Sequence, residues 1–112
     1  MKIAISSAGK DLTSLVAEVF GRCPYFLIVE IDNKKIKEFE VLENTSVNQT
    51  GGAGISVAQM VAEKNVNTII TGSVGPRALD VLKQFNISAY NSVGLIKDAI
   101  QKFIEGKLEE IK

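Results

Sequence analysis

Short apolar runs alternate with amphipathic stretches along most of this chain, and this alternation is the feature that most constrains its fold. Apolar side chains recur at helical spacing from Ile55 to about Asn65, and Asn67–Thr71 follows as a short apolar strand pattern. A second helical stretch begins at Pro76, and Ile87–Tyr90 is the next strand pattern. Strands and helices that alternate with short links predict parallel strands joined by right-handed crossovers.

The ends of the chain complete the predicted series. Lys2–Ser6 has the pattern of a first strand, and the recurring apolar residues between positions 12 and 20 predict a short helix capped by Asp11. Near the other end, Ser92 is expected to cap a final helix that Gly106 terminates. The charged run Glu105–Lys112 is expected to be a solvated tail.

A hairpin is predicted between these parts. Tyr25–Ile31 is almost continuously apolar, which is typical of a strand buried on both faces, and Asp32-Asn33-Lys34 has turn chemistry. Lys35–Leu42 then returns as a more polar, antiparallel strand at the edge of the sheet. The whole pattern predicts one α/β domain over residues 1–112, with a five-stranded mixed sheet flanked by helices.

The composition excludes several classes of function. Thirteen basic and thirteen acidic residues cancel, so we expect neither nucleic acid nor a membrane surface as a partner. The absence of histidine removes the usual general base and the commonest transition-metal ligand. One cysteine, Cys23, excludes an internal disulfide and is the only soft metal ligand on offer. Because no signal-peptide pattern or membrane span is present, we expect a cytoplasmic protein.

A polar, glycine-rich loop from Asn44 to Ile55 is the first candidate for a binding site. Roughly ten residues without a strand or helix pattern exceed the usual ~4–6 of a connection in a compact domain, and such long loops are often functional. The loop ends in Thr50, Gly51, Gly52 and Gly54 at the start of a predicted helix. A helix start exposes unpaired N–H groups that attract anions, although the same glycines also suit a flexible connector.

Two further groups of residues are binding candidates. Ser73 and Arg77 flank the helix start at Gly75-Pro76 and together offer a hydroxyl and a guanidinium to an oxyanion. Arg22 and Cys23 precede Pro24 in a predicted turn. If that turn exposes the thiol, the guanidinium would lower the thiol pKa; the other interpretation is a buried, inert cysteine. In an open α/β sheet both glycine loops should lie at the edge formed by the carboxyl ends of the parallel strands.

Four segments together resemble a known family. They are Phe20-Gly-Arg-Cys-Pro-Tyr-Phe26, Gly51-Gly-Ala-Gly-Ile-Ser-Val-Ala58, Ile70-Thr-Gly-Ser-Val-Gly-Pro76 and Phe103-Ile-Glu-Gly-Lys-Leu108. In order and spacing they resemble the dinitrogenase iron-molybdenum cofactor biosynthesis family, over nearly the whole chain. The resemblance implies a ribonuclease H-like fold. It also implies an iron-sulfur or iron-molybdenum cofactor precursor as ligand, and cofactor-assembly proteins as partners.

The chain departs from this family in its metal chemistry. Cluster-carrying relatives are expected to offer cysteine or histidine ligands, and here Gln59 and Met60 follow Ala58. An anionic cofactor would instead be held at its periphery by backbone N–H groups and by Arg22 or Arg77. The leading hypothesis is therefore a non-catalytic protein that binds a small anionic metal cofactor.

Two other functions stay open at this point. The first is a regulatory or interaction domain that recognises a partner protein or a phosphate-bearing metabolite without any metal cluster. The second is an enzyme, which would need an unusual base such as Glu30 or Asp32. A nuclease with two metal ions is disfavoured, because the first strand ends in Ser6-Ser7 and carries no acidic residue.

Overall fold

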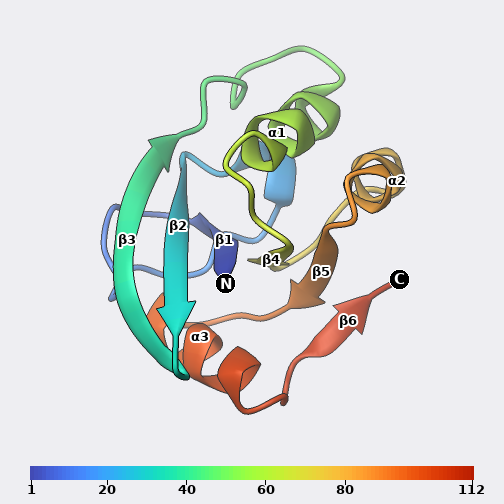
Figure 1. Ribbon diagram of the computed structural model, residues 1–112. Helices are drawn as coiled ribbons and strands as arrows, with labels where there is room; N and C mark the ends of the chain where they lie inside the picture. Colours follow the sequence, from blue (N-terminus) through green and yellow to red (C-terminus); the bar gives the residue numbers. More distant parts are fainter.

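The computed structural model describes residues 1–112 as one mixed sheet with helices on both faces (Figure 1). The strands are β1 (Lys2–Ser7), β2 (Tyr25–Asp32), β3 (Lys35–Glu43), β4 (Thr68–Thr71), β5 (Ser88–Asn91) and β6 (Glu109–Ile111). The helices are α1 (Ala53–Ala62), α2 (Pro76–Gln84) and α3 (Ile96–Ile104), with a short 3₁₀ turn, η1 (Phe20–Arg22). The helices have ten residues at most, and none has the length and apolar character needed to cross a bilayer.

The sheet has six strands in the order β3-β2-β1-β4-β5-β6. The expected parallel core is confirmed, since β1 pairs with β4 and β4 pairs with β5 in parallel. The predicted hairpin of β2 and β3 is also present, and its turn residues Asn33 and Lys34 have φ angles of 53° and 62°. Two consecutive positive φ angles match the twist of antiparallel strands, which explains the tight connection.

Alternating side chains of the strands build two separate cores. Ala4, Phe26 and Ile69 belong to a cluster on the face covered by α1 and α2. Ile3 and Ile5, on the opposite face, belong to a second cluster that packs under α3. Because successive residues of a strand point to opposite faces, one continuous apolar run can fill both layers. The prediction that Tyr25–Ile31 is buried on both faces is confirmed.

The predicted helix between positions 11 and 20 is wrong. This segment runs as an irregular chain along the end of the sheet, with isolated bridges that pair Leu15 with Leu95 and Val19 with Ser73. Leu15 and Val19 are 57% and 45% exposed, so the helical spacing of apolar residues does not mark a buried stripe here. Asp11 caps no helix; its carboxylate accepts hydrogen bonds from the amide and hydroxyl of Thr13.

Two predictions at the carboxyl-terminal end also need correction. Ser92 does not cap α3; the carbonyl groups of Leu12 and Ser14 accept the first amide hydrogen bonds of that helix instead. The run Glu105–Lys112 is not a free tail, because residues 109–111 form a sixth strand that pairs antiparallel with β5. Gly106 does follow the end of α3 with a φ of 73°, as predicted.

Candidate functional site

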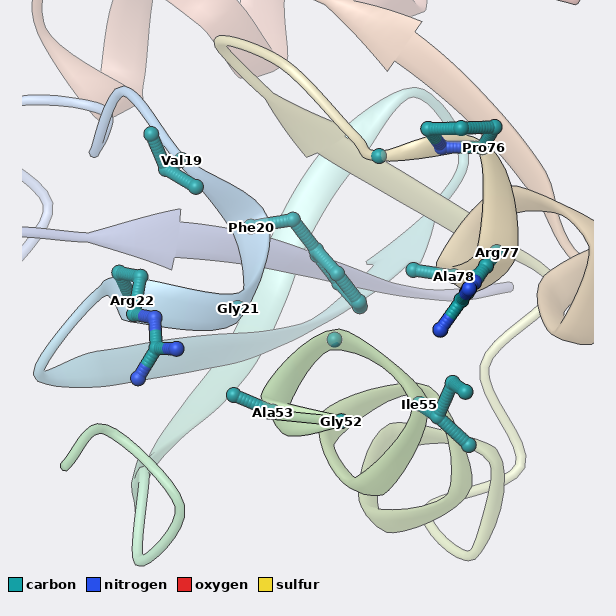
Figure 2. Close-up of a pocket in the computed structure, with 12 residues that line it drawn as sticks. Val19, Phe20, Gly21, Arg22, Gly52, Ala53, Ile55, Pro76, Arg77 and Ala78 are labelled. Atoms are coloured by element: carbon teal, nitrogen blue, oxygen red, sulfur yellow. The ribbon is translucent and has the colours of Figure 1, made fainter. Parts of the chain in front are cut away.

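A cavity of about 390 Å³ opens where η1, the start of α1 and the start of α2 meet. Figure 2 shows α1 and α2 beginning on either side of it, with the η1 turn beside them. Twelve residues from these three segments line it: Val19, Phe20, Gly21, Arg22, Gly52, Ala53, Gly54, Ile55, Gly75, Pro76, Arg77 and Ala78. Both predicted helix-start loops therefore contribute to one site.

The chain approaches itself closely beneath this cavity. A Cβ atom added to Gly21 would lie 3.0 Å from the backbone N and Cα of Gly54, and one added to Gly54 would lie 3.0 Å from Cβ of Ala78. Glycine at these two positions lets η1, α1 and α2 pack together. Phe20 is buried beside them, and its ring packs edge-on against that of Phe26 with the ring centroids 5.3 Å apart. This contact anchors η1 to β2.

The start of α1 presents backbone donors that the protein does not use. The N–H groups of Ala53, Gly54 and Ile55 have no hydrogen-bond acceptor in the chain. The first paired amide at this helix start is that of Ser56, which donates to the carbonyl oxygen of Gly52. Gly52 precedes them with a φ of 68°, and no side chain caps the helix. Such unpaired N–H groups at a helix amino terminus carry partial positive charge and suit an anion.

The start of α2 has the same character. Pro76 occupies its first turn, as predicted, and no side chain caps it. The amides of Arg77 and Ala78 also lack an acceptor in the chain. At α3, by contrast, the first amides donate to carbonyl groups of the segment between β1 and η1. The two helix starts with unpaired amides are therefore the two that border the cavity.

Two arginines contribute the only charged side chains among the lining residues. The Arg77 side chain is exposed, makes no hydrogen bond or ion pair within the chain, and extends toward Ile55 at the start of α1 in Figure 2. Arg22 lies on the other side, where its Nη1 donates to the carbonyl oxygens of Val47 at 3.0 Å and Gln49 at 2.7 Å. With no carboxylate in the lining, the electrostatic character of the cavity is positive.

The structure separates the predicted binding residues into two groups. Arg22, Gly52, Gly54 and Arg77 line the cavity, whereas Thr50, Gly51, Ser73 and Cys23 do not. The Ser73 hydroxyl donates to the carbonyl oxygen of Glu18 at 3.1 Å. Gly51 has a φ of 73° and helps the loop turn into α1. Thr50 is exposed on that loop.

Cys23 has the buried environment that was the alternative to a reactive thiol. The residue is 1% exposed, and its Sγ donates to the carbonyl oxygen of Phe20 at 3.4 Å. Burial raises the pKa of this thiol to about 12 from its ordinary value of 9.0, despite lowering contributions from nearby hydrogen bonds. The interpretation in which Arg22 lowers the thiol pKa is therefore wrong.

Several lining residues were not among the predicted binding residues. Val19, Gly21 and Ala78 reach the cavity only because three separate segments pack together. Phe20 and Gly21 did belong to a segment that carried the family resemblance, which was the one signal available for them. Nothing in the spacing of an apolar residue such as Val19 distinguishes a cavity wall from a core position.

Comparisons with known proteins agree with one another. The family described as dinitrogenase iron-molybdenum cofactor matches residues 1–106. An uncharacterised protein of Methanocaldococcus jannaschii is 44% identical over 94 residues, which cover 83% of this chain and 80% of that protein.

Solved structures are also similar to this chain. The apo form of the orange protein from Desulfovibrio gigas superposes with a TM-score of 0.91 at 29% identity, over 98% of this chain and 92% of that one. A Thermotoga protein described as a candidate NifB protein has a TM-score of 0.83 at 37% identity, over 97% and 91% of the two chains.

Proposed function

The chain belongs to the dinitrogenase iron-molybdenum cofactor family, and we propose that it is a non-catalytic protein that binds a small anionic metal cofactor, or a precursor of one, in the cavity between η1, α1 and α2. In this proposal the protein carries the ligand for cofactor-assembly proteins, which are the proposed partners of this chain. We also propose, from the family resemblance, that the mixed sheet is a form of the ribonuclease H-like fold.

One observation carries this proposal. Five backbone amides without acceptors, at the starts of two helices, border the same cavity as two arginines, and no carboxylate lines it. Charge-assisted hydrogen bonds from guanidinium and from helix-terminal amides are a common way of holding an anion. The accessible apolar side chains of the lining, Val19, Ile55 and Pro76, would contact the remainder of the ligand.

The donor set decides what kind of metal species could bind. No group of three or more Cys, Asp or Glu side chains is placed to hold a metal ion, the chain has no histidine, and the thiol of Cys23 lies outside the cavity. These residues do not fit a metal ion that needs ligands from the protein. They fit a metal complex whose coordination is already complete and whose periphery accepts hydrogen bonds.

The lining also supports a non-catalytic role. It contains no Ser, Thr, Cys, Lys, Asp, Glu or Tyr, so it offers neither a nucleophile nor a side chain that accepts a proton near neutral pH. The two acidic residues considered as bases, Glu30 and Asp32, lie on β2 away from the cavity. Binding, rather than turnover, is the chemistry that this set of groups suits.

Tetrathiomolybdate is a suitable probe, because it is a coloured molybdenum–sulfide dianion that carries its own complete set of ligands. We expect it to co-elute with the wild-type protein under anaerobic conditions and to bind measurably in an absorbance titration. Arg77→Gln should weaken binding about tenfold, equivalent to ~1.4 kcal/mol. Lys83→Gln, in the last turn of the same helix, removes the same charge away from the cavity and should leave binding unchanged.

The second candidate function is recognition of a phosphate-bearing metabolite. The same amides and guanidinium groups would bind a phosphate group equally well in geometric terms. A thermal-shift comparison of sodium phosphate, nucleotides and tetrathiomolybdate separates the candidates, since a ligand of the folded state raises apparent stability by mass action. Stabilisation by phosphate compounds alone would favour this second function. No response to any of these anions would refute both.

A further inference from the structure

The guanidinium of Arg22 is committed to the loop that precedes α1. Its Nη1 donates to the carbonyl oxygens of Val47 and Gln49, at 3.0 and 2.7 Å. Figure 2 shows the Arg22 side chain directed toward that loop, whereas the Arg77 side chain extends between α2 and α1. The two arginines at the cavity therefore have different surroundings, and the sequence alone gives no reason to distinguish them.

The base of the same loop is fixed independently of Arg22. Asn44 is buried, its Nδ2 donates to the carbonyl oxygen of Cys23 at 2.8 Å, and its backbone amide donates to that of Pro24 at 3.0 Å. Its Oδ1 accepts the amide of Ser46 at 2.9 Å. Within residues 47–51 the amide of Gln49 donates to the carbonyl oxygen of Ser46, and its Nε2 donates to that of Gly51. Arg22 is the only group outside residues 46–51 that makes a hydrogen bond to residues 47–51.

This anchoring matters for the direction of the unpaired amides. Gly51 and Gly52 both have positive φ angles, 73° and 68°, and no side chain caps α1. Two consecutive glycines leave the helix entry free to adopt many conformations unless the preceding loop is held. The contact between Arg22 and the loop supplies that constraint immediately before the amides of Ala53 and Gly54.

We propose that Arg22 is a positioning residue, which holds the loop of residues 47–51 and thereby fixes the anion-binding start of α1, and that Arg77 supplies the charged side chain that contacts the anion. This assignment rests on the proposed function. Both hydrogen bonds come from one nitrogen, Nη1, whose two N–H groups are held in the fixed plane of the guanidinium. A lysine at this position keeps the charge, but its ammonium is a point charge on a flexible stem whose N–H groups have no fixed plane.

The first test needs no ligand. Backbone ¹⁵N relaxation should show order parameters near 0.85 for residues 47–51 of the wild type, and below about 0.6 in both Arg22→Lys and Arg22→Gln. Ser46 is an internal control, because Asn44 holds it, and its amide should stay rigid in every variant. Arg77→Gln should leave the loop as ordered as in the wild type. An ordered loop in both Arg22 variants would overturn the proposal.

The second test titrates tetrathiomolybdate into the same variants. Arg22→Lys should bind at least fivefold more weakly although its net charge is unchanged, and Arg77→Gln should bind more weakly with an ordered loop. Weak binding by Arg22→Lys with an ordered loop would make Arg22 a direct contact and overturn its positioning role. If the wild type binds no anion, the proposed function fails, while the relaxation data still decide whether Arg22 holds the loop.

Discussion

Alkaline pH is expected to destabilise the fold through the thiol of Cys23. Burial raises the pKa of this thiol from 9.0 to about 12 in the folded protein, whereas the unfolded chain exposes it to water. Below pH 9 the thiol is protonated in both states and contributes no pH dependence. Between pH 9 and 12 only the unfolded state loses the proton, so stability falls as pH rises through this window.

The size of the effect follows from the pKa difference. Each unit of pH within the window costs ~1.4 kcal/mol of unfolding free energy, so the full shift of about three units is worth ~4 kcal/mol. At pH 10, one unit above the unfolded-state pKa, the expected loss is about 1.4 kcal/mol. That is a measurable fraction of the ~5–15 kcal/mol typical of a small domain.

Urea denaturation of the wild type and of Cys23→Ala, with a reductant present, isolates this contribution. Every other contribution to the pH dependence is present in both proteins and cancels in the comparison. Cys23→Ala is expected to be less stable than the wild type at pH 7, because it removes a buried side chain. The difference between the two proteins should shrink by about 1.4 kcal/mol at pH 10. If the difference in unfolding free energy between the two proteins were the same at pH 7 and pH 10, the buried, neutral thiol would be refuted.

Two further predictions test the packing and the hydrogen bonds near the site. Gly72→Ala should destabilise the protein by ~1–3 kcal/mol in thermal or urea denaturation, because the added Cβ would lie 2.5 Å from the carbonyl oxygen of Glu18. Gly75→Ala is the control, and it should leave stability unchanged because the added Cβ would meet only open space. Equal stability of these two variants would contradict the close approach. Asn44→Ala should lower the free energy of unfolding by ~1–3 kcal/mol and loosen the loop at Ser46, because it removes a buried side-chain amide with three hydrogen-bond partners. If this variant were as stable as the wild type, Asn44 would not be what fixes the base of the loop.

The segment between β1 and η1 shows where local pattern fails. Its apolar residues recur at helical spacing, yet the backbone amide of Val16 donates to the carbonyl of Gly94 and that of Ala17 to Ser6. These partners lie far away in the sequence or on the preceding strand, and a helix would have replaced such bonds with local ones. Because helix propensity is a weak preference, tertiary hydrogen bonds along the end of the sheet can override it.

The sixth strand has a similar cause. Glu109, Glu110 and Ile111 look like part of a charged tail, and two of the three are exposed. What makes them a strand is the free edge of β5, which pairs with all three, together with the partial burial of Ile111 against the core beneath α2. An edge strand of this kind depends on a partner that only the folded sheet supplies.

Apolar patterns and turn chemistry within the sequence were enough to predict β1, β2, β3, α1, β4, α2, β5 and α3. Burial of a strand on both faces, burial of a helix on one face and a tight turn between two strands each leave a recognisable pattern. These patterns also predicted that two glycine-containing loops begin helices. Only the tertiary structure decided that these starts share one cavity with η1, that Cys23 is buried, and that Arg22 is bonded to a loop while Arg77 is not. The physical reason is that periodicity records which side of an element is buried, whereas a binding site depends on where separate elements meet.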